Sequence, residues 1–185
     1  MNEYAVKIGE LTVSLPLVKV NDELSIYSFN MMGKASWNRE AAKVISREIS
    51  PGGTDDFYAV VTAESKAIAL AEQLTELFAM DRYVVLRKSV KAYMENPIEV
   101  ETQSITTAGV QHLYVDRTDA EYIKGKKVLV VDDVVSTGGT LDAIFKIAEK
   151  ADFKIARIAC VLTEGVKRTE YNGVPLISID HIPIP

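Results

Sequence analysis

The chain has 185 residues, of which 48% are hydrophobic and 25% are charged. These values predict one globular domain with a packed core and exclude collagen-like, disulfide-scaffold and largely disordered proteins. The formal net charge of −5 argues against a broad surface for nucleic acids or anionic membranes, so any anion site must be local. The chain has a single cysteine, and its start, MNEYAVKIGE, does not resemble a signal peptide. It also has no long apolar run, so we expect a cytoplasmic protein without a membrane span.

The N-terminal part of the chain differs from the rest. Between Leu11 and Phe29, short apolar and β-branched runs flank a turn signal at Asn21 and Asp22, which predicts a small β-rich lobe over about residues 1–35. A helix is expected next, because Ser36 is a suitable N-cap and apolar residues follow it at helical spacing.

From Phe57 onward, predicted strands and helices alternate. The strands are expected at 57–62, 83–87, 111–115, 128–131, 154–162 and 174–179, and the helices at 66–78 and 140–151. This order predicts an α/β fold with a central, mostly parallel sheet flanked by helices, and the chain as a single domain whose core spans about residues 36–185. Residues 88–107 carry charge, a proline and no clear period, so a long mobile loop is expected there.

The segment VLVVDDVVSTGGT, residues 128–140, carries the most chemical information. An apolar strand runs into Asp132 and Asp133, and a glycine- and hydroxyl-rich turn leads into a helix. Open α/β sheets bind ligands beyond the carboxyl ends of their strands, and a helix N-terminus favours anions. The turn 136–140 offers backbone N–H groups, hydroxyl donors and glycines that let a phosphate approach. Because carboxylates repel phosphate, the acid pair must face sugar hydroxyls or a divalent cation, which indicates a sugar phosphate.

Other interpretations of this segment are an ordinary strand-to-helix turn with a capping residue and a phosphoacceptor receiver domain. A receiver's acidic pair comes near the start of its chain, and too few residues follow Asp133 to complete that fold. The sequence motifs of nucleotide phosphate loops, dinucleotide sites and zinc proteases do not occur in the chain.

Residues 128–140 resemble the phosphoribosyl-diphosphate (PRPP) signature of the type I phosphoribosyltransferases. The order of the flanking elements resembles the adenine phosphoribosyltransferase branch over nearly the whole chain. Residues 61–66 are similar to the pyrophosphate loop of that family, and Arg87-Lys88 with Lys91 is similar to its basic strand end before a mobile loop. Leu162-Thr163-Glu164 matches a further strand end.

The resemblance implies transfer of ribose 5-phosphate from PRPP to a purine, with adenine favoured, and release of pyrophosphate. It also implies Mg²⁺, carried mainly by PRPP near the acid pair, and a homodimer whose mobile loop completes the neighbouring site. The residues that it assigns fall into four groups: catalytic Asp132, Asp133, Arg87 and Lys91; 5′-phosphate-binding Val135, Ser136, Thr137, Gly138, Gly139 and Thr140; pyrophosphate-binding Ala63, Glu64, Ser65, Lys66, Arg87, Lys88 and Lys91; and base-binding Tyr27, Phe29 and Val134.

Several of these residues also have simpler interpretations. The cations after residue 86 could form a solvated cluster, and residues 63–66 could be a helix start whose side chains satisfy free N–H groups. The apolar residues Tyr27, Phe29 and Met31 could belong to the core. His112 and His181 show no metal or triad pattern, and Cys160 is expected to be an inert buried thiol.

The sequence departs from the adenine branch at SITTAG, where Thr107 takes the place of a glutamate that can handle the purine ring proton. A threonine cannot act as a general base near neutral pH. The proton must leave through water, Glu99 or Glu101, or the enzyme uses hypoxanthine, guanine or xanthine. A PRPP-sensing regulator and a nucleotide-binding relative without turnover are the competing functions. Regulators of DNA or RNA would need a recognition domain or a basic face, which the composition does not suggest.

Overall fold

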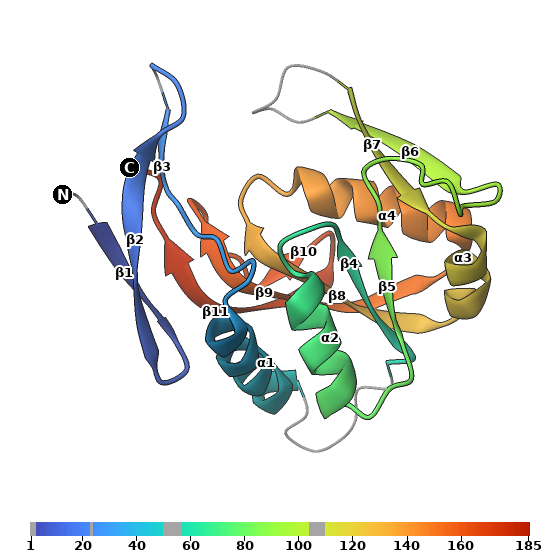
Figure 1. The fold of residues 1–185 in the computed structure, drawn as a ribbon, viewed down its shortest axis with the longest axis horizontal. Helices are drawn as coiled ribbons and strands as arrows, with labels where there is room; N and C mark the ends of the chain where they lie inside the picture. Colours follow the sequence, from blue (N-terminus) through green and yellow to red (C-terminus); the bar gives the residue numbers. More distant parts are fainter. Residues whose placement is uncertain (1–2, 23, 50–56, 104–109) are drawn as a thin grey trace.

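The computed structural model describes residues 3–22, 24–49, 57–103 and 110–185, and a six-stranded sheet lies at its centre (Figure 1). In spatial order the strands are β10 (Glu170–Tyr171), β11 (Val174–Ile182), β9 (Lys154–Glu164), β8 (Lys127–Val135), β4 (Ala59–Ala63) and β5 (Tyr83–Leu86). All neighbours from β11 to β5 pair in parallel, and only β10 is antiparallel, at one edge. The predicted, mostly parallel sheet is therefore confirmed.

The central strand β8 is apolar because both faces of the sheet are covered. Val128 and Val130 pack into one core cluster, with α3 (Arg117–Ile123) and α4 (Gly139–Ala151). Leu129 and Val131 pack into a second cluster on the other face, with α1 (Ala35–Ile49) and α2 (Ile68–Leu77). None of the helices within the described ranges is long and apolar enough to cross a membrane.

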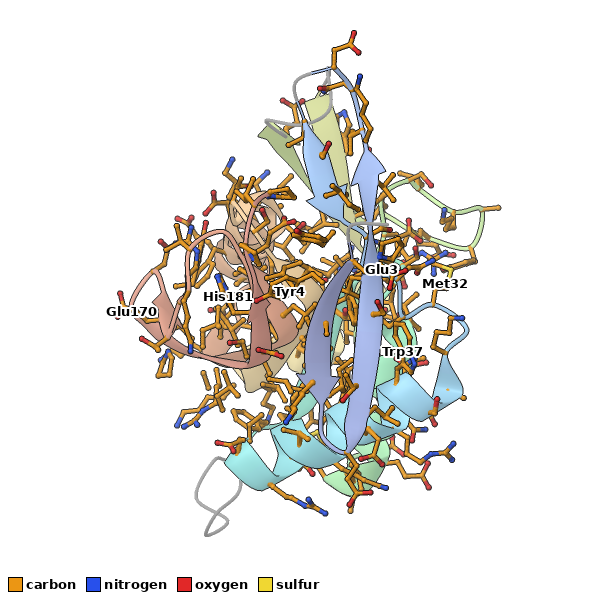
Figure 2. All side chains as sticks on the ribbon, turned by 90° about the vertical axis from the view of Figure 1, so that its left-hand side faces the viewer. Glu3, Tyr4, Met32, Trp37, Glu170 and His181 are labelled. Atoms are coloured by element: carbon orange, nitrogen blue, oxygen red, sulfur yellow. The ribbon has the colours of Figure 1, made fainter. Side chains whose placement is uncertain are left out.

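A three-stranded antiparallel sheet of β1 (Glu3–Ile8), β2 (Leu11–Lys19) and β3 (Ser25–Tyr27) confirms the β-rich N-terminal lobe, called the hood below. The extended runs were expected from Leu11 onward, whereas β1 already lies before them in the chain. The hood stands beside β11 of the main sheet (Figure 2). The backbone N–H of Lys7 donates to Oδ2 of Asp180 at 2.7 Å, which ties β1 to β11.

The prediction of a long loop at residues 88–107 is wrong in part. Strand β6 (Ile98–Gln103) lies within this range and pairs antiparallel with β7 (Val110–Val115). Apolar and acidic residues alternate along Ile98-Glu99-Val100-Glu101, and Val100 is buried in the same cluster as α4. The alternation is short, which hides its period of two. The end of the expected loop, including Thr107, lies outside the described residues.

Other boundaries also differ from the expectation. Strand β8 does not end before Asp132 but runs through both acids, with Asp132 opposite Cys160 on β9. Helix α1 begins at Ala35, so Ser36 lies within its first turn and is not its N-cap. Helix α3 was not expected; it is short, and Asp116 caps it by accepting hydrogen bonds from the Thr118 backbone and hydroxyl.

Candidate active site

The predicted functional segments meet at one edge of the main sheet, where the chain reverses its direction of winding. From β4 the chain moves outward to β5, and β8 lies on the other side of β4. Connections that leave β4 and β8 at their carboxyl ends therefore diverge and open a crevice, the usual ligand position in open α/β sheets. Residues 63–66, 86–91 and 132–140 all lie at this edge (Figure 1).

The acid pair lies at the carboxyl end of β8. Asp133 is 8% exposed, its backbone N–H donates to Oδ1 of Asp132 at 2.9 Å, and its Oδ2 lies 3.4 Å from Nζ of Lys66. This contact joins the β4 and β8 loops, as expected for one shared site. Burial, and then the negative charge of Asp133, raise the pKa of Asp132 well above its ordinary value. Ionising Asp132 therefore costs folding stability.

The turn between β8 and α4 has the features of a phosphate cradle. Gly138 adopts the left-handed conformation, with φ of 97°, and immediately precedes the first residue of α4, Gly139. The N-terminal N–H groups of α4 therefore open onto the turn. Ser136 is partly exposed and Thr137 and Thr140 are exposed, whereas the Val135 side chain is 2% exposed and packs in the core. Val135 can contact a ligand only through its backbone.

Tyr171 on β10 supports this turn and was not found from the sequence. Its hydroxyl lies 2.8 Å from Oδ1 of Asp142, to which it donates, and 3.2 Å from the carbonyl oxygen of Gly138. Burial, followed by the hydrogen bond to Asp142, raises the pKa of Tyr171 to about 12. The sequence signal that could have found it is the dipeptide Asn172-Gly173, which is typical of a two-residue hairpin turn. In the structure this turn places Tyr171 opposite Val174.

The cations at the end of β5 gather around the carboxylate of Glu64. Nε of Arg87 lies 2.9 Å from Oε2 of Glu64, the backbone N–H of Lys88 donates to Oε1 at 2.5 Å, and Nζ of Lys91 lies 3.9 Å from Oε1. The backbone of Arg87 is also paired with Tyr114 on β7 in both directions at 2.8 Å. Arg87 and Lys91 thus form an ion-pair network around Glu64, whereas Lys88 joins it through its backbone and its side chain is exposed.

The hood residues expected to bind a base differ in their accessibility. Phe29 is 5% exposed and stacks on Trp37 with 5.8 Å between ring centroids, so it contributes to the core, as does its neighbour Met31, which is fully buried as the core interpretation expects. Tyr27 and Val134 are only half-buried; Tyr27 packs at a tilt against Tyr4. Stacking of a base on either of them stays a prediction.

The residues at the acid pair fit a hydrated Mg²⁺ ion. Oδ2 of Asp133 is buried and receives no hydrogen bond from the part of the chain that the structure describes. Carboxylate oxygens are preferred ligands of Mg²⁺, which keeps several waters and is usually shared between one or two carboxylates and substrate phosphates. Asp132 and Asp133 would hold such an ion together with the ligand.

The remaining candidates from the sequence have structural partners. Nδ1 of His181 lies 3.0 Å from Oγ1 of Thr163, and Nδ1 of His112 lies 2.6 Å from Oε1 of Glu99. Cys160 is fully buried, and burial raises the pKa of its thiol, in agreement with an inert role.

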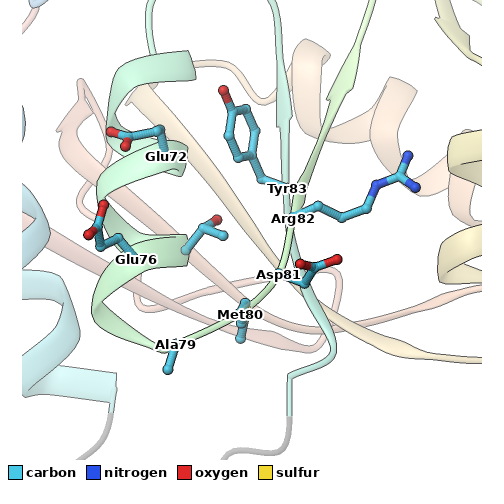
Figure 3. A pocket seen from close by; sticks show the side chains of 8 residues that line it. Glu72, Glu76, Ala79, Met80, Asp81, Arg82 and Tyr83 are labelled. Atoms are coloured by element: carbon cyan, nitrogen blue, oxygen red, sulfur yellow. The ribbon is translucent and has the colours of Figure 1, made fainter.

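A separate groove of about 670 Å³ lies between the end of α2 and the start of β5 (Figure 3). Glu72, Glu76, Asp81 and Arg82 contribute to its lining. Since it opens at the amino end of β5, it lies away from the carboxyl edge that carries the predicted site.

Comparison with known proteins agrees with this geometry. The phosphoribosyl transferase domain model matches residues 35–182. A hypoxanthine/guanine phosphoribosyltransferase of Methanothermococcus okinawensis is 34% identical over 149 residues, 77% of each chain. Another, of Methanocaldococcus vulcanius, is 34% identical over 144 residues, 75% of this chain and 74% of that protein.

Similar solved structures come from a different branch of enzymes. Adenine phosphoribosyltransferase of Thermoanaerobacter pseudethanolicus superposes with a TM-score of 0.74 at 17% identity, covering 90% of this chain and 95% of that chain. The enzyme of Giardia lamblia, complexed with 9-deazaadenine, gives a TM-score of 0.67 at 18% identity, covering 97% and 93%. At these identities the likeness shows the fold alone.

Proposed function

The chain belongs to the phosphoribosyl transferase family, and from that premise we propose that it transfers ribose 5-phosphate from PRPP to a 6-oxopurine, hypoxanthine or guanine, and releases pyrophosphate. The observation that carries the proposal is the meeting of three groups at one sheet edge. These are the acid pair of β8, the phosphate turn before α4 and the cation cluster after β5.

Each group suits one part of the reaction. The turn at residues 136–140 binds the 5′-phosphate through backbone N–H groups and hydroxyls. In the reaction the bond between the anomeric carbon and pyrophosphate breaks, a bond to a purine ring nitrogen forms, and the purine loses a proton. Asp132 and Asp133 face the ribose side, where positive charge develops. Arg87, Lys88 and Lys91 meet the negative charge that grows on the leaving pyrophosphate.

Mg²⁺ would be carried by PRPP at the acid pair, where it would supply further positive charge to the pyrophosphate oxygens. Oδ2 of Asp133, which is buried and accepts no hydrogen bond from the described residues, supports this part of the proposal. The ammonium group of Lys66 lies 3.4 Å from that oxygen. Lys66 therefore brings the loop after β4 to the place where the ligand would bind.

The choice of a 6-oxopurine replaces the expectation of adenine that came from the resemblance. Relatives at 34% identity over three quarters of the chain are named as hypoxanthine/guanine enzymes. The adenine enzymes among the solved structures support the fold and carry no argument about the base. Thr107 in place of a glutamate also argues against the adenine branch.

The test is to incubate the protein with PRPP, Mg²⁺ and adenine, hypoxanthine, guanine or xanthine in separate reactions, and to measure released pyrophosphate. We expect turnover with hypoxanthine and guanine and less than a tenth of that rate with adenine, since polar base recognition discriminates by more than about tenfold. Asp133→Asn is the control for background hydrolysis. Turnover with adenine alone contradicts the base assignment. PRPP binding without turnover on any base would favour the nucleotide-binding relative.

The functional unit is proposed to be a homodimer, because in this family the basic strand end and the following loop complete the neighbouring site. Sedimentation of the protein at assay concentrations tests this. An active monomer would contradict it.

A further inference from the structure

Glu64 occupies the centre of the cation cluster that the proposed reaction needs for its leaving group. Its side chain is only 15% exposed. One carboxylate oxygen pairs with Arg87, and the other accepts from the backbone N–H of Lys88 and lies within ion-pair distance of Lys91. Both oxygens are therefore engaged by the cluster.

The backbone fixes the carboxylate in this position. The N–H of Glu64 donates to the carbonyl oxygen of Leu86 at 2.8 Å, which joins the end of β4 to the end of β5 directly before Arg87. Lys91 is oriented further by Ser89, whose Oγ accepts from Nζ at 2.6 Å. The network thus runs across two neighbouring strands at the carboxyl edge of the sheet.

A pyrophosphate bound to this cluster would need the same donors. Two parallel contacts from a guanidinium and a backbone N–H to one oxyanion are the pattern by which proteins bind phosphate oxygens. The Glu64 carboxylate already fills that pattern. Since a carboxylate has no donor at neutral pH and repels a diphosphate, Glu64 cannot be the direct pyrophosphate ligand that the family resemblance implies.

We propose that Glu64 is a built-in counter-anion that takes the place of the pyrophosphate oxygens in the ligand-free protein and competes with them. It keeps Arg87, Lys91 and the backbone N–H of Lys88 gathered while no ligand is bound, and it lowers the affinity for pyrophosphate so that this product leaves. The inference rests on the proposed function for the identity of the ligand. Glu64 is a positioning residue, because it acts through Arg87, Lys88 and Lys91.

The test compares Glu64→Gln with the wild type by titration calorimetry, using sodium pyrophosphate with and without Mg²⁺. A glutamine removes the negative charge and keeps one oxygen, which can still accept from the backbone N–H of Lys88, while its NH₂ group replaces the oxygen that pairs with Arg87. We expect pyrophosphate to bind about threefold to tenfold more tightly to the variant, the effect of one partly exposed charge pair. In product-inhibition assays, the inhibition constant for pyrophosphate should fall by the same factor.

Glu76→Gln is the matched control, because it removes the same charge in the separate groove between α2 and β5. It should leave pyrophosphate affinity unchanged. Thermal unfolding of both variants checks that they are folded. Unchanged or weaker pyrophosphate binding by folded Glu64→Gln overturns the counter-anion role and indicates a purely structural carboxylate. If the wild type itself binds neither PRPP nor pyrophosphate, the proposed function fails instead.

Discussion

The hydroxyl of Tyr171 donates a hydrogen bond to the carboxylate of Asp142, at 2.8 Å, and so joins the edge strand β10 to the first turn of α4. The same hydroxyl lies 3.2 Å from the carbonyl oxygen of Gly138. One side chain therefore holds both the turn and the helix whose N–H groups would bind the 5′-phosphate. Its ring is covered on one side by the guanidinium of Arg168, 5.6 Å from the ring centroid.

Removing this hydroxyl with Tyr171→Phe should weaken PRPP binding by about threefold to tenfold, equivalent to one hydrogen bond of about 1 kcal/mol. The reason is that the phosphate turn loses a restraint while its own donors remain. Calorimetric titration with PRPP measures the effect, and Tyr83→Phe in the separate groove is the control. Equal PRPP affinity in Tyr171→Phe and wild type would show that the turn holds its shape without Tyr171.

Gly138→Ala should damage the site more than a similar change elsewhere. Gly138 has φ of 97°, and a Cβ atom at this position would collide with the Tyr171 ring. Gly125 also has positive φ, 69°, but open space around it, so Gly125→Ala isolates the backbone cost of about 1–2 kcal/mol. We expect urea unfolding to show a larger loss for Gly138→Ala, and PRPP affinity to fall only in that variant. Equal losses in the two variants would contradict the collision.

Asp132→Asn should stabilise the ligand-free protein near pH 7 while abolishing turnover. The folded-state pKa of Asp132 is raised above its unfolded value. The protonated carboxyl of Asp132 thus contributes its full share to the free energy of unfolding below the unfolded pKa of about 3.9. This contribution is lost as the pH rises through the folded-state pKa. Asparagine mimics the protonated form at every pH and avoids this loss.

The gain from Asp132→Asn should therefore grow as the pH rises above 3.9 and vanish below it. Each kcal/mol raises Tm by about 2–4 °C in a protein of this size. Thermal unfolding between about pH 3 and 8, in EDTA and without PRPP, measures it. Asp22→Asn, which removes a carboxylate whose side chain is 98% exposed, is the control for the loss of a charge that is not buried. A gain that is the same at all pH values would rule out charge burial as its cause.

The sequence was sufficient for the parts of the site that are encoded in contiguous runs. The apolar run before Asp132, the glycine pair and the following helical period predict a strand, a turn and a helix by local chemistry alone. Residues 63–66 were assigned to the same site by their resemblance to the pyrophosphate loop of the family. In the structure, Lys66 from this segment lies 3.4 Å from Asp133 at the end of β8.

The missing parts depend on contacts between residues that are distant in the chain. Tyr171 follows Gly138 by 33 residues in the chain. It reaches Gly138 only because β10 pairs with β11 at the edge of the sheet. Glu64 was assigned to the pyrophosphate loop, but its pairing with Arg87 is a matter of side-chain direction, which strand periodicity does not specify. Strand β6 was missed because two apolar residues, Ile98 and Val100, are too few to establish a period.

Glu99, one of the two carboxylates considered as the base that accepts the purine proton, is unsuited to that role by its surroundings. Oε1 of Glu99 accepts from the Tyr114 hydroxyl at 2.8 Å and lies 2.6 Å from Nδ1 of His112. The hydrogen bond from Tyr114, and to a lesser extent His112, lowers the pKa of Glu99, which makes its carboxylate a weaker base.

The position of Glu99 leads to the same conclusion. Its carbonyl oxygen accepts from Nζ of Lys150 at 2.8 Å. Lys150 lies in the last turn of α4, about 16 Å along the helix from the end that would bind phosphate.

Glu99→Gln should therefore keep its turnover within about twofold of wild type, whereas loss of a true general base costs about 10²–10⁴-fold. Steady-state rates with hypoxanthine and PRPP between pH 6 and 9 measure this. Glu101→Gln is the parallel variant, because the backbone carbonyl of Glu101 likewise accepts a hydrogen bond from a lysine of α4, Lys146. If both variants keep their turnover and the shape of the pH profile, the proton leaves through water or a group beyond these two carboxylates. A hundredfold loss in Glu99→Gln alone, with the protein folded, would restore Glu99 as the base and would mean that the β6–β7 hairpin moves toward α4's N-terminus during turnover.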